Sequence, residues 1–280
     1  SLVPGVHFIF KPKNIKSVSK HVLTLQSFMV WSNNNFVVSN DNVAQKSTNE
    51  IYPQIKYNYD NKRTLDPFDF EACLEMVNGD FTWRPKLTAA FRYYLSYGGM
   101  RKAFTARIFA GITSNGTKYA QQGYASGLYM SGTNTYLDYR REYLFLGRNE
   151  YGSSNIASHQ MVANEGGFKM YTATANSGKW ITSLNLSARI PKLKFIGVFA
   201  DVGTYYNAGN TFEGSKEVVF DAGASLIIVQ NAFEIYFPIK WSSDIEQFYE
   251  VNNSKKYSDK IRFQLNLHLV KPYKYLSQLF

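Results

Sequence analysis

The feature that most constrains this chain is a period-two alternation of apolar and polar residues that returns in one segment after another. It is clearest in IRFQLNLHL, residues 261–269, where every odd position is apolar and every even position is polar. Successive side chains of a β-strand point to opposite faces of the sheet, so such a segment has one apolar and one polar face. Eleven segments fit the pattern, at residues 6–10, 23–31, 51–59, 68–76, 87–97, 103–112, 183–190, 195–205, 218–228, 232–241 and 261–269. The chain is therefore predicted to be all-β.

The lengths of the segments and of the connections favour a transmembrane barrel over a soluble sandwich. Most segments have about nine to eleven residues, the length that a tilted strand needs to cross a bilayer, whereas strands of soluble proteins have about five or six. Short connections, near residues 14, 61, 97, 191 and 229, alternate with long ones at residues 33–49, 113–178, 207–217 and 243–258. Tight turns on one side and long loops on the other are typical of outer-membrane barrels. We therefore expect a transmembrane antiparallel β-barrel of about twelve strands, eleven of them visible, in the cell outer membrane.

Residues 1–280 are predicted to form one barrel domain, with residues 113–178 as a long inserted loop or plug. Bacterial single-chain barrels have an even number of strands and both termini on the periplasmic side. Counting back from residues 261–269 places the start of residues 6–10 on the outer side. We therefore expect at least one strand to be missing upstream. Either this chain is the C-terminal part of a longer polypeptide, or it pairs with a strand supplied elsewhere. A crossing hidden within residues 122–147 would also change the count.

The polar face of the strands carries charges that a barrel would place in its lumen, because lipid lies outside and polar groups lie inside. In residues 232–241, for example, the pattern assigns Trp241 to the apolar face and Lys240 to the polar face. Paired charges would fill a narrow lumen and close it to ions. The predicted lumen-facing network contains Arg92, Arg107, Arg189, Asp201, Asp221, Glu234, Lys240 and Arg262, together with Glu71 and Glu75. Glycines on the same face, such as Gly203, would leave room for bulky neighbours.

The long middle segment, residues 113–178, interrupts the alternation and includes DYRREYLFLGRNE at residues 138–150. A connection of this length is uncommon and is often functional. It could fold into the lumen as a plug, or it could be an ordinary surface loop, and the sequence leaves both open. In a plug, its charged residues would pair with the inward-facing Asp201, Asp221 or Glu234. The candidates for such pairs are Arg140, Arg141, Glu142, Arg148 and Glu150.

Several function classes lack their signatures. One cysteine, Cys73, permits neither an intrachain disulfide nor a zinc site built from cysteines. The four histidines form no HExxH motif, no GxSxG motif is present, and no phosphate loop is found, so we predict no catalytic residue, metal or cofactor. The net charge is +10, but basic residues are spread along the chain without a nucleic-acid-binding module, so no nucleic acid is expected. The expected partners are outer-membrane lipid and lipopolysaccharide, and other outer-membrane or periplasmic proteins.

Two sets of residues resemble known barrels. Phe199–Gly203, Ala222–Leu226, Tyr236–Ile239 and Ile261–Leu265 resemble the C-terminal strands of surface-antigen-type barrels of the outer-membrane assembly and two-partner translocation superfamily, although the RGY/F lid-loop motif is absent. RYYLSYGGMRKAFTARIFAGI, LGRNE, EGGFK and KIRFQLNL are similar to the barrel that follows the catalytic region of gluzincin (membrane alanyl aminopeptidase-like) metallopeptidases of Gram-negative bacteria.

In the gluzincin family the zinc motif lies upstream of the barrel. The resemblance therefore implies a membrane anchor whose peptidase activity would belong to a portion outside this chain. The expected function is a membrane-embedding domain with a scaffold, pore or translocation role. The alternatives are the anchor of a zinc aminopeptidase and a soluble ligand-binding β protein.

Overall fold

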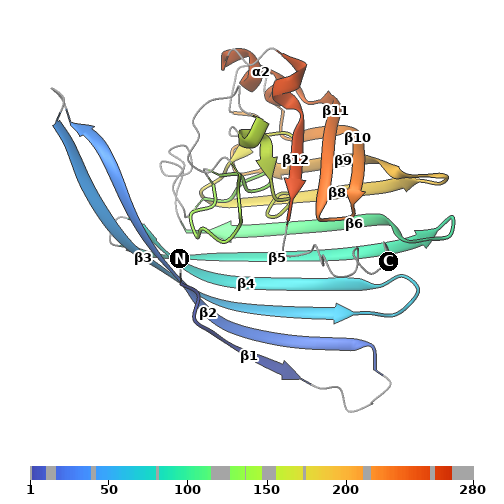
Figure 1. The fold of residues 1–280 in the computed structure, drawn as a ribbon, viewed down its shortest axis with the longest axis horizontal. Helices are drawn as coiled ribbons and strands as arrows, with labels where there is room; N and C mark the ends of the chain where they lie inside the picture. The colour runs from blue at the N-terminus through green and yellow to red at the C-terminus, as the bar shows by residue number, and fades with distance from the viewer. Residues whose placement is uncertain are drawn as a thin grey trace, which may run out of the picture.

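A single curved sheet of twelve strands organises the molecule (Figure 1). The computed structural model describes residues 2–10, 17–38, 42–79, 82–114, 127–135, 137–146, 156–172, 175–210, 216–252 and 256–266. The strands are β1 (Gly5–Phe10), β2 (Ser19–Val38), β3 (Asn42–Asn61), β4 (Phe68–Gly79), β5 (Thr82–Tyr97), β6 (Met100–Thr113), β7 (Gln160–Met161), β8 (Trp180–Ile190), β9 (Leu193–Tyr205), β10 (Val219–Val229), β11 (Phe233–Trp241) and β12 (Arg262–Leu265). The described connections contain the short helices η1 (Ile156–His159), α2 (Ser243–Val251) and η3 (Tyr257–Lys260).

The order of the strands is β1-β2-β3-β4-β5-β6-β8-β9-β10-β11-β12-β7, and β12 with β7 is the one parallel pair among the strands that the structure describes. The all-β prediction is confirmed, and each of the eleven predicted segments is represented by one strand. β2 and β3 are longer than expected, because the ladder continues to the pair Val38↔Asn42. Residues 33–49 were predicted to be a loop, but the described residues among them, 33–38 and 42–49, are strand. Backbone pairing satisfies their N–H and C=O groups without the apolar alternation that the prediction required.

The twelfth strand of the sheet is β7, and it comes from the long middle segment. It pairs with β12 through Phe263↔Gln160 and Gln264↔Met161. The sheet is therefore not closed among the described residues, and its edge strands are β1 and β7. The crossing considered within residues 122–147 is absent from the described residues 127–135 and 137–146. Residues 127–135 form only isolated bridges, and 137–146 form none. A strand supplied from upstream stays a prediction.

The described part of the middle segment lies on the concave side of the sheet, where β6 to β12 curl around it (Figure 1). We call residues 127–135, 137–146, 156–172 and 175–178 the inner segment. Leu128, Met130, Phe168 and Met170 in this segment are fully buried, so these residues pack against the concave side of the sheet. The role of the segment as a plug stays a prediction. Gly203 of β9 contributes to the fit, since a Cβ there would lie 2.6 Å from Sδ of Met130.

Among the described residues, no helix combines the length and the apolar character that a membrane crossing requires.

Candidate functional site

The two faces of the sheet differ sharply in polarity and in exposure. Ile108 on the convex face is 53% exposed, whereas its neighbour Arg107 on the concave face is 7% exposed. The pairing register extends this contrast across six strands, because residues directly opposite one another share a face. We call the convex set the apolar row; its members, in order from β4 to β10, are Phe70, Phe91, Ile108, Leu184, Val202 and Phe220.

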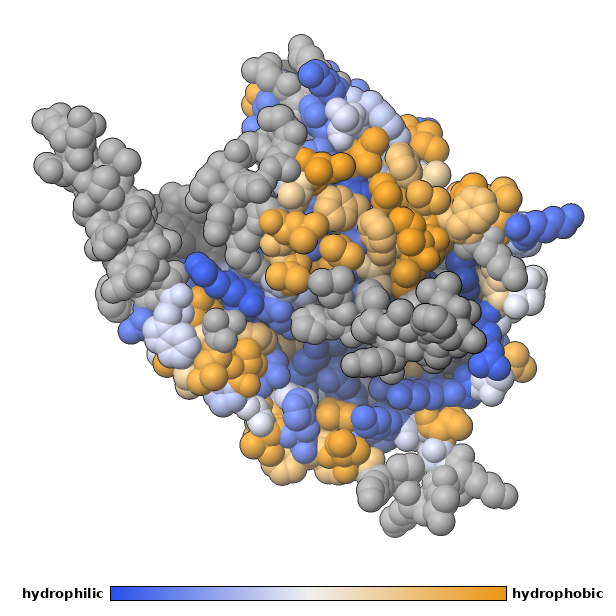
Figure 2. Space-filling view, viewed as in Figure 1, coloured by the Kyte–Doolittle hydropathy of each residue, from blue (hydrophilic) through white to orange (hydrophobic). Residues whose placement is uncertain are grey.

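The concave face carries a matching line of polar side chains one residue away. This polar ladder runs from β4 to β10 through directly opposite pairs, and its members are Asp69, Arg92, Arg107, Asn185, Asp201 and Asp221. The last two are completely buried. Figure 2 shows both kinds of surface, with an apolar patch over β10 to β12 and hydrophilic side chains in the hollow beside it. The polar face is therefore turned toward the inner segment and not toward the outside.

Four of the eight predicted network residues, Arg92, Arg107, Asp201 and Asp221, belong to this ladder. Two others lie at the end of the sheet that carries the connections 62–67, 98–99, 191–192 and 230–232, here called the tight-turn end. There Arg189 donates to the carbonyl of Arg101, and Glu234 accepts from the Tyr236 hydroxyl at 3.1 Å. Arg189 and Glu234 therefore form local contacts that do not involve the polar ladder.

Arg262 is buried on the concave side of β12, beside the inner segment. Its Nε and Nη2 lie 3.5 and 3.4 Å from the carbonyls of His159 and Gln160, and its guanidinium carbon lies 5.5 Å from the centroid of the Tyr171 ring. Arg262 thus helps to hold β7 at the edge of the sheet.

Lys240 lies outside the network, which corrects the prediction. A bulge shifts the register between Ala222 and Gly223, so Lys240 pairs with Ala222 of the convex face and is exposed. Trp241 consequently pairs with Asp221 and packs against the buried core. One extra residue in a strand exchanges the faces of all that follow.

Arg140 of the inner segment forms an ion pair with Glu75 of β4 at 2.9 Å. The predicted partners were instead Asp201, Asp221 or Glu234. Glu75 also accepts hydrogen bonds from Gln54 and from the Tyr139 hydroxyl. Arg141 is exposed, and the predicted Arg148 and Glu150 lie outside the described residues. The partner was missed because Glu75 is far from the inner segment in sequence.

Two further ion pairs between the inner segment and the sheet were not predicted from the sequence. Lys86 of β5, 3% exposed, bonds Glu165 at 2.6 Å and the carbonyl of Gly127 at 2.9 Å. Lys169 approaches Asp201 of the ladder at 3.2 Å. Lys86 directly precedes the segment 87–97, so extending the alternation by one residue would have identified it as inward-facing. Together with Arg140–Glu75, these pairs fasten the inner segment to β4, β5 and β9.

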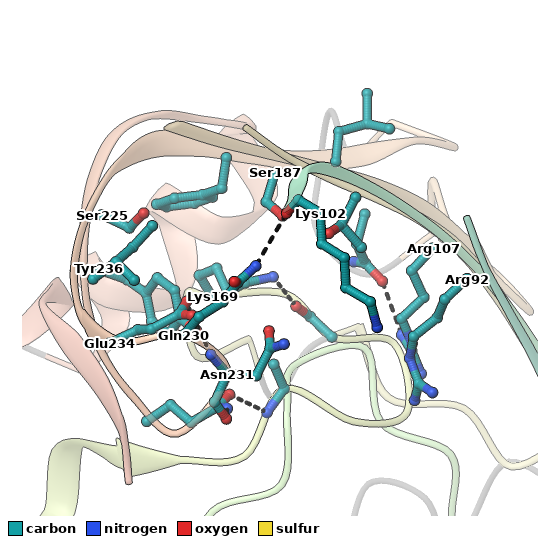
Figure 3. A pocket seen from close by; sticks show the side chains of 18 of the residues that line it. Arg92, Lys102, Arg107, Lys169, Ser187, Ser225, Gln230, Asn231, Glu234 and Tyr236 are labelled. Atoms are coloured by element: carbon teal, nitrogen blue, oxygen red, sulfur yellow. Dashed lines mark hydrogen bonds between the residues drawn. The ribbon is translucent and has the colours of Figure 1, made fainter. Parts of the chain in front are cut away.

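A polar cavity of about 410 Å³, here called the interior cavity, lies between the inner segment and the tight-turn end. Its walls come from β3 to β6, β8 to β12 and the inner segment. Figure 3 shows Arg92, Arg107 and Lys102 directed into it from one side, opposite Glu234 and Tyr236. Within the described residues no group of three or more His, Cys, Asp and Glu side chains is placed to hold a metal ion.

Compared with known proteins, the chain matches no protein-family model and no curated protein sequence.

Proposed function

We propose that this chain is an outer-membrane β-barrel domain, embedded through its convex face and filled by its inner segment, and that it serves as a membrane anchor or scaffold. The observation that carries the proposal is the reversed polarity of the sheet. Large apolar side chains point outward and charges point inward, the opposite of a water-soluble sandwich. Exposed apolar patches of this extent mark membrane or protein contacts.

The height of the apolar face supports lipid as its environment. On β5 the outward positions from Trp83 to Leu95 are Trp83, Pro85, Leu87, Ala89, Phe91, Tyr93 and Leu95, and none is charged. Twelve residue steps of about 3.3 Å span about 40 Å along the strand. A tilt of about 40° reduces this to about 30 Å, the thickness of the hydrocarbon core.

The inner segment favours an anchor or scaffold over an open pore. Its buried side chains and three ion pairs occupy the concave side, where a porin would hold a water-filled channel. We therefore expect no large steady conductance when the protein is added to planar bilayers. The alternative role as anchor of a zinc aminopeptidase shares the embedding step and places the chemistry in another portion of the polypeptide.

Refolding into lipid vesicles tests the embedding. The protein, diluted from denaturant, should become resistant to carbonate extraction and should migrate differently on gels with and without heating. Leu184→Lys places a charge in the apolar row, which should cost about 2–4 kcal/mol near the bilayer midplane and abolish insertion. Leu65→Lys is the matched control, since Leu65 is 71% exposed in the connection between β3 and β4. Equal insertion of both variants, or release of the wild type by carbonate, would overturn the proposal.

A further inference from the structure

The interior cavity has an excess of basic groups in its wall. Its lining contains the basic residues Lys56, Arg92, Lys102, Arg107, Lys169 and Arg189, and the acidic residues Glu71 and Glu234. Three of the basic residues have a carboxylate partner, in the pairs Lys56–Glu71, Arg92–Asp69 and Lys169–Asp201. For Lys102, Arg107 and Arg189, no carboxylate of the described residues lies within ion-pair distance. The cavity is therefore electropositive.

Arg107 is the most deeply buried of these three basic residues. Its side chain is at least nine-tenths buried, and its Nη1 donates to Oδ1 of Asn185 at 2.8 Å. Its Nε is buried without a hydrogen-bond partner among the described residues. A guanidinium has five N–H donors and no acceptor, and a buried charge without a counterion is costly. Arg107 also lines the interior cavity. An anion bound there would supply the counterion that the described residues do not provide.

Lys102 and Arg92 complete the arrangement. Lys102 reaches into the cavity from the start of β6, with its Nζ 4.2 Å from the centroid of the Tyr94 ring (Figure 3). Arg92 is directly opposite Arg107 in the register and also lines the cavity. A cavity of about 410 Å³ lies within the range of small-molecule sites.

We propose that the interior cavity binds a small solute through an oxyanion group, a phosphate or a carboxylate, held between Arg107 and Lys102. Guanidinium groups match such oxygens with paired hydrogen bonds, and the ammonium adds a second positive charge. Arg92 raises the local potential while it stays paired with Asp69. Gln230 also lines the cavity, and its amide has two N–H groups, of which one donates to the carbonyl of Lys102 at 3.1 Å. The other is a neutral donor for the rest of the solute.

Calorimetric titration of the folded protein in detergent micelles with inorganic phosphate tests this site. Low ionic strength is needed, because salt screens the attraction. The wild type should bind phosphate saturably, and Arg107→Met should bind about tenfold or more weakly, since hydrogen bonds from charged donors are lost. Lys102→Met should also weaken binding. Lys216→Met removes an exposed positive charge outside the cavity lining and should bind as the wild type does.

If Arg107→Met does not fold, Lys102→Met still tests the site. Lys102 is exposed and contributes little to packing, so this variant should fold. Absence of saturable binding to the wild type would overturn the site. So would wild-type affinity in Lys102→Met, or an equal loss in Lys216→Met, which would indicate a general charge effect. The measurement needs no bilayer, so failure of phosphate binding and failure of membrane insertion are separate results.

Discussion

Nη1 of Arg140 lies 2.9 Å from Oε2 of Glu75, and this contact joins the inner segment to β4. Glu75 is 2% exposed. Arg140 has a second carboxylate, Glu142, at 3.1 Å. Among the described residues, Arg140 has a second carboxylate within ion-pair distance, whereas Glu75 has no second basic partner. Loss of Arg140 should therefore affect Glu75 more than loss of Glu75 affects Arg140.

This asymmetry predicts unequal effects of the two single replacements. Arg140→Met leaves a buried carboxylate without its ion-pair partner and should lower the free energy of unfolding by about 3 kcal/mol or more. Glu75→Gln should cost about 1–2 kcal/mol, since Arg140 keeps Glu142. Chemical unfolding in micelles measures both. The half-exposed pair Lys56–Glu71 provides the control, and Lys56→Met should cost less than about 1 kcal/mol. A larger effect of Glu75→Gln would contradict the unequal dependence.

Glu142 predicts a dependence of stability on pH. Burial raises the pKa of its carboxyl, and the nearby Arg140 offsets this only in part. The folded protein then holds the proton more tightly than the unfolded chain, whose glutamate pKa is about 4.3. This contribution is therefore favourable at low pH and is lost as the pH rises through the folded-state pKa.

Glu142→Gln removes the cost of ionising Glu142. The variant should be more stable than the wild type at pH 7, and the difference should shrink toward pH 4. Unfolding midpoints measured between these values check the trend. Glu217→Gln, at an exposed position, controls for the loss of one negative charge. A Glu142→Gln variant that is less stable at pH 7 would show that the contact with Arg140 outweighs the burial.

Gly166 predicts a steric requirement within the inner segment. A Cβ at this position would lie 2.3 Å from the carbonyl oxygen of Met130, so Gly166→Ala must move the backbone. We expect a loss of about 2–3 kcal/mol and faster proteolysis of the inner segment in the folded protein. Gly99→Ala is the comparison: its Cβ would meet nothing within 4 Å, but its φ of +73° favours glycine. That variant should cost about 1 kcal/mol and leave the proteolysis rate unchanged.

The strands and their faces could be predicted from the sequence because a period-two pattern is local information. The parity that placed Arg107 inside and Ile108 outside needed only neighbouring residues. The partner of Arg140 could not be predicted in this way. Glu75 lies 65 residues before it, and the contact depends on how the inner segment folds back across the sheet. The parallel pairing of β7 with β12 depends on the same return of the chain.

Lys240 and Trp241 lie on the opposite faces of β11 to those predicted, and the sequence contains a residue, Pro238, that the odd-even alternation did not take into account. Pro238 has no N–H to donate to a ladder, so prolines within sheets occur at edges, strand starts or bulges. Here Pro238 lies opposite Gly223, at the register shift. A proline alone does not decide the faces, because Pro53 of β3 and Pro85 of β5 lie in ladders without a register shift. Placing a bulge at Pro238 would have removed Lys240 from the predicted lumen network.

The bulge also predicts which tryptophans meet lipid. Trp83 and Trp180 lie on the convex face and are 51% and 38% exposed, whereas Trp241 packs against the core, with Nζ of Lys260 4.8 Å from its ring centroid. We expect brominated lipids to quench the fluorescence of variants that retain only Trp83 or only Trp180. A variant that retains only Trp241 should be quenched weakly. Quenching of Trp241 as strong as that of Trp180 would place it on the lipid face and contradict the shifted register of β11.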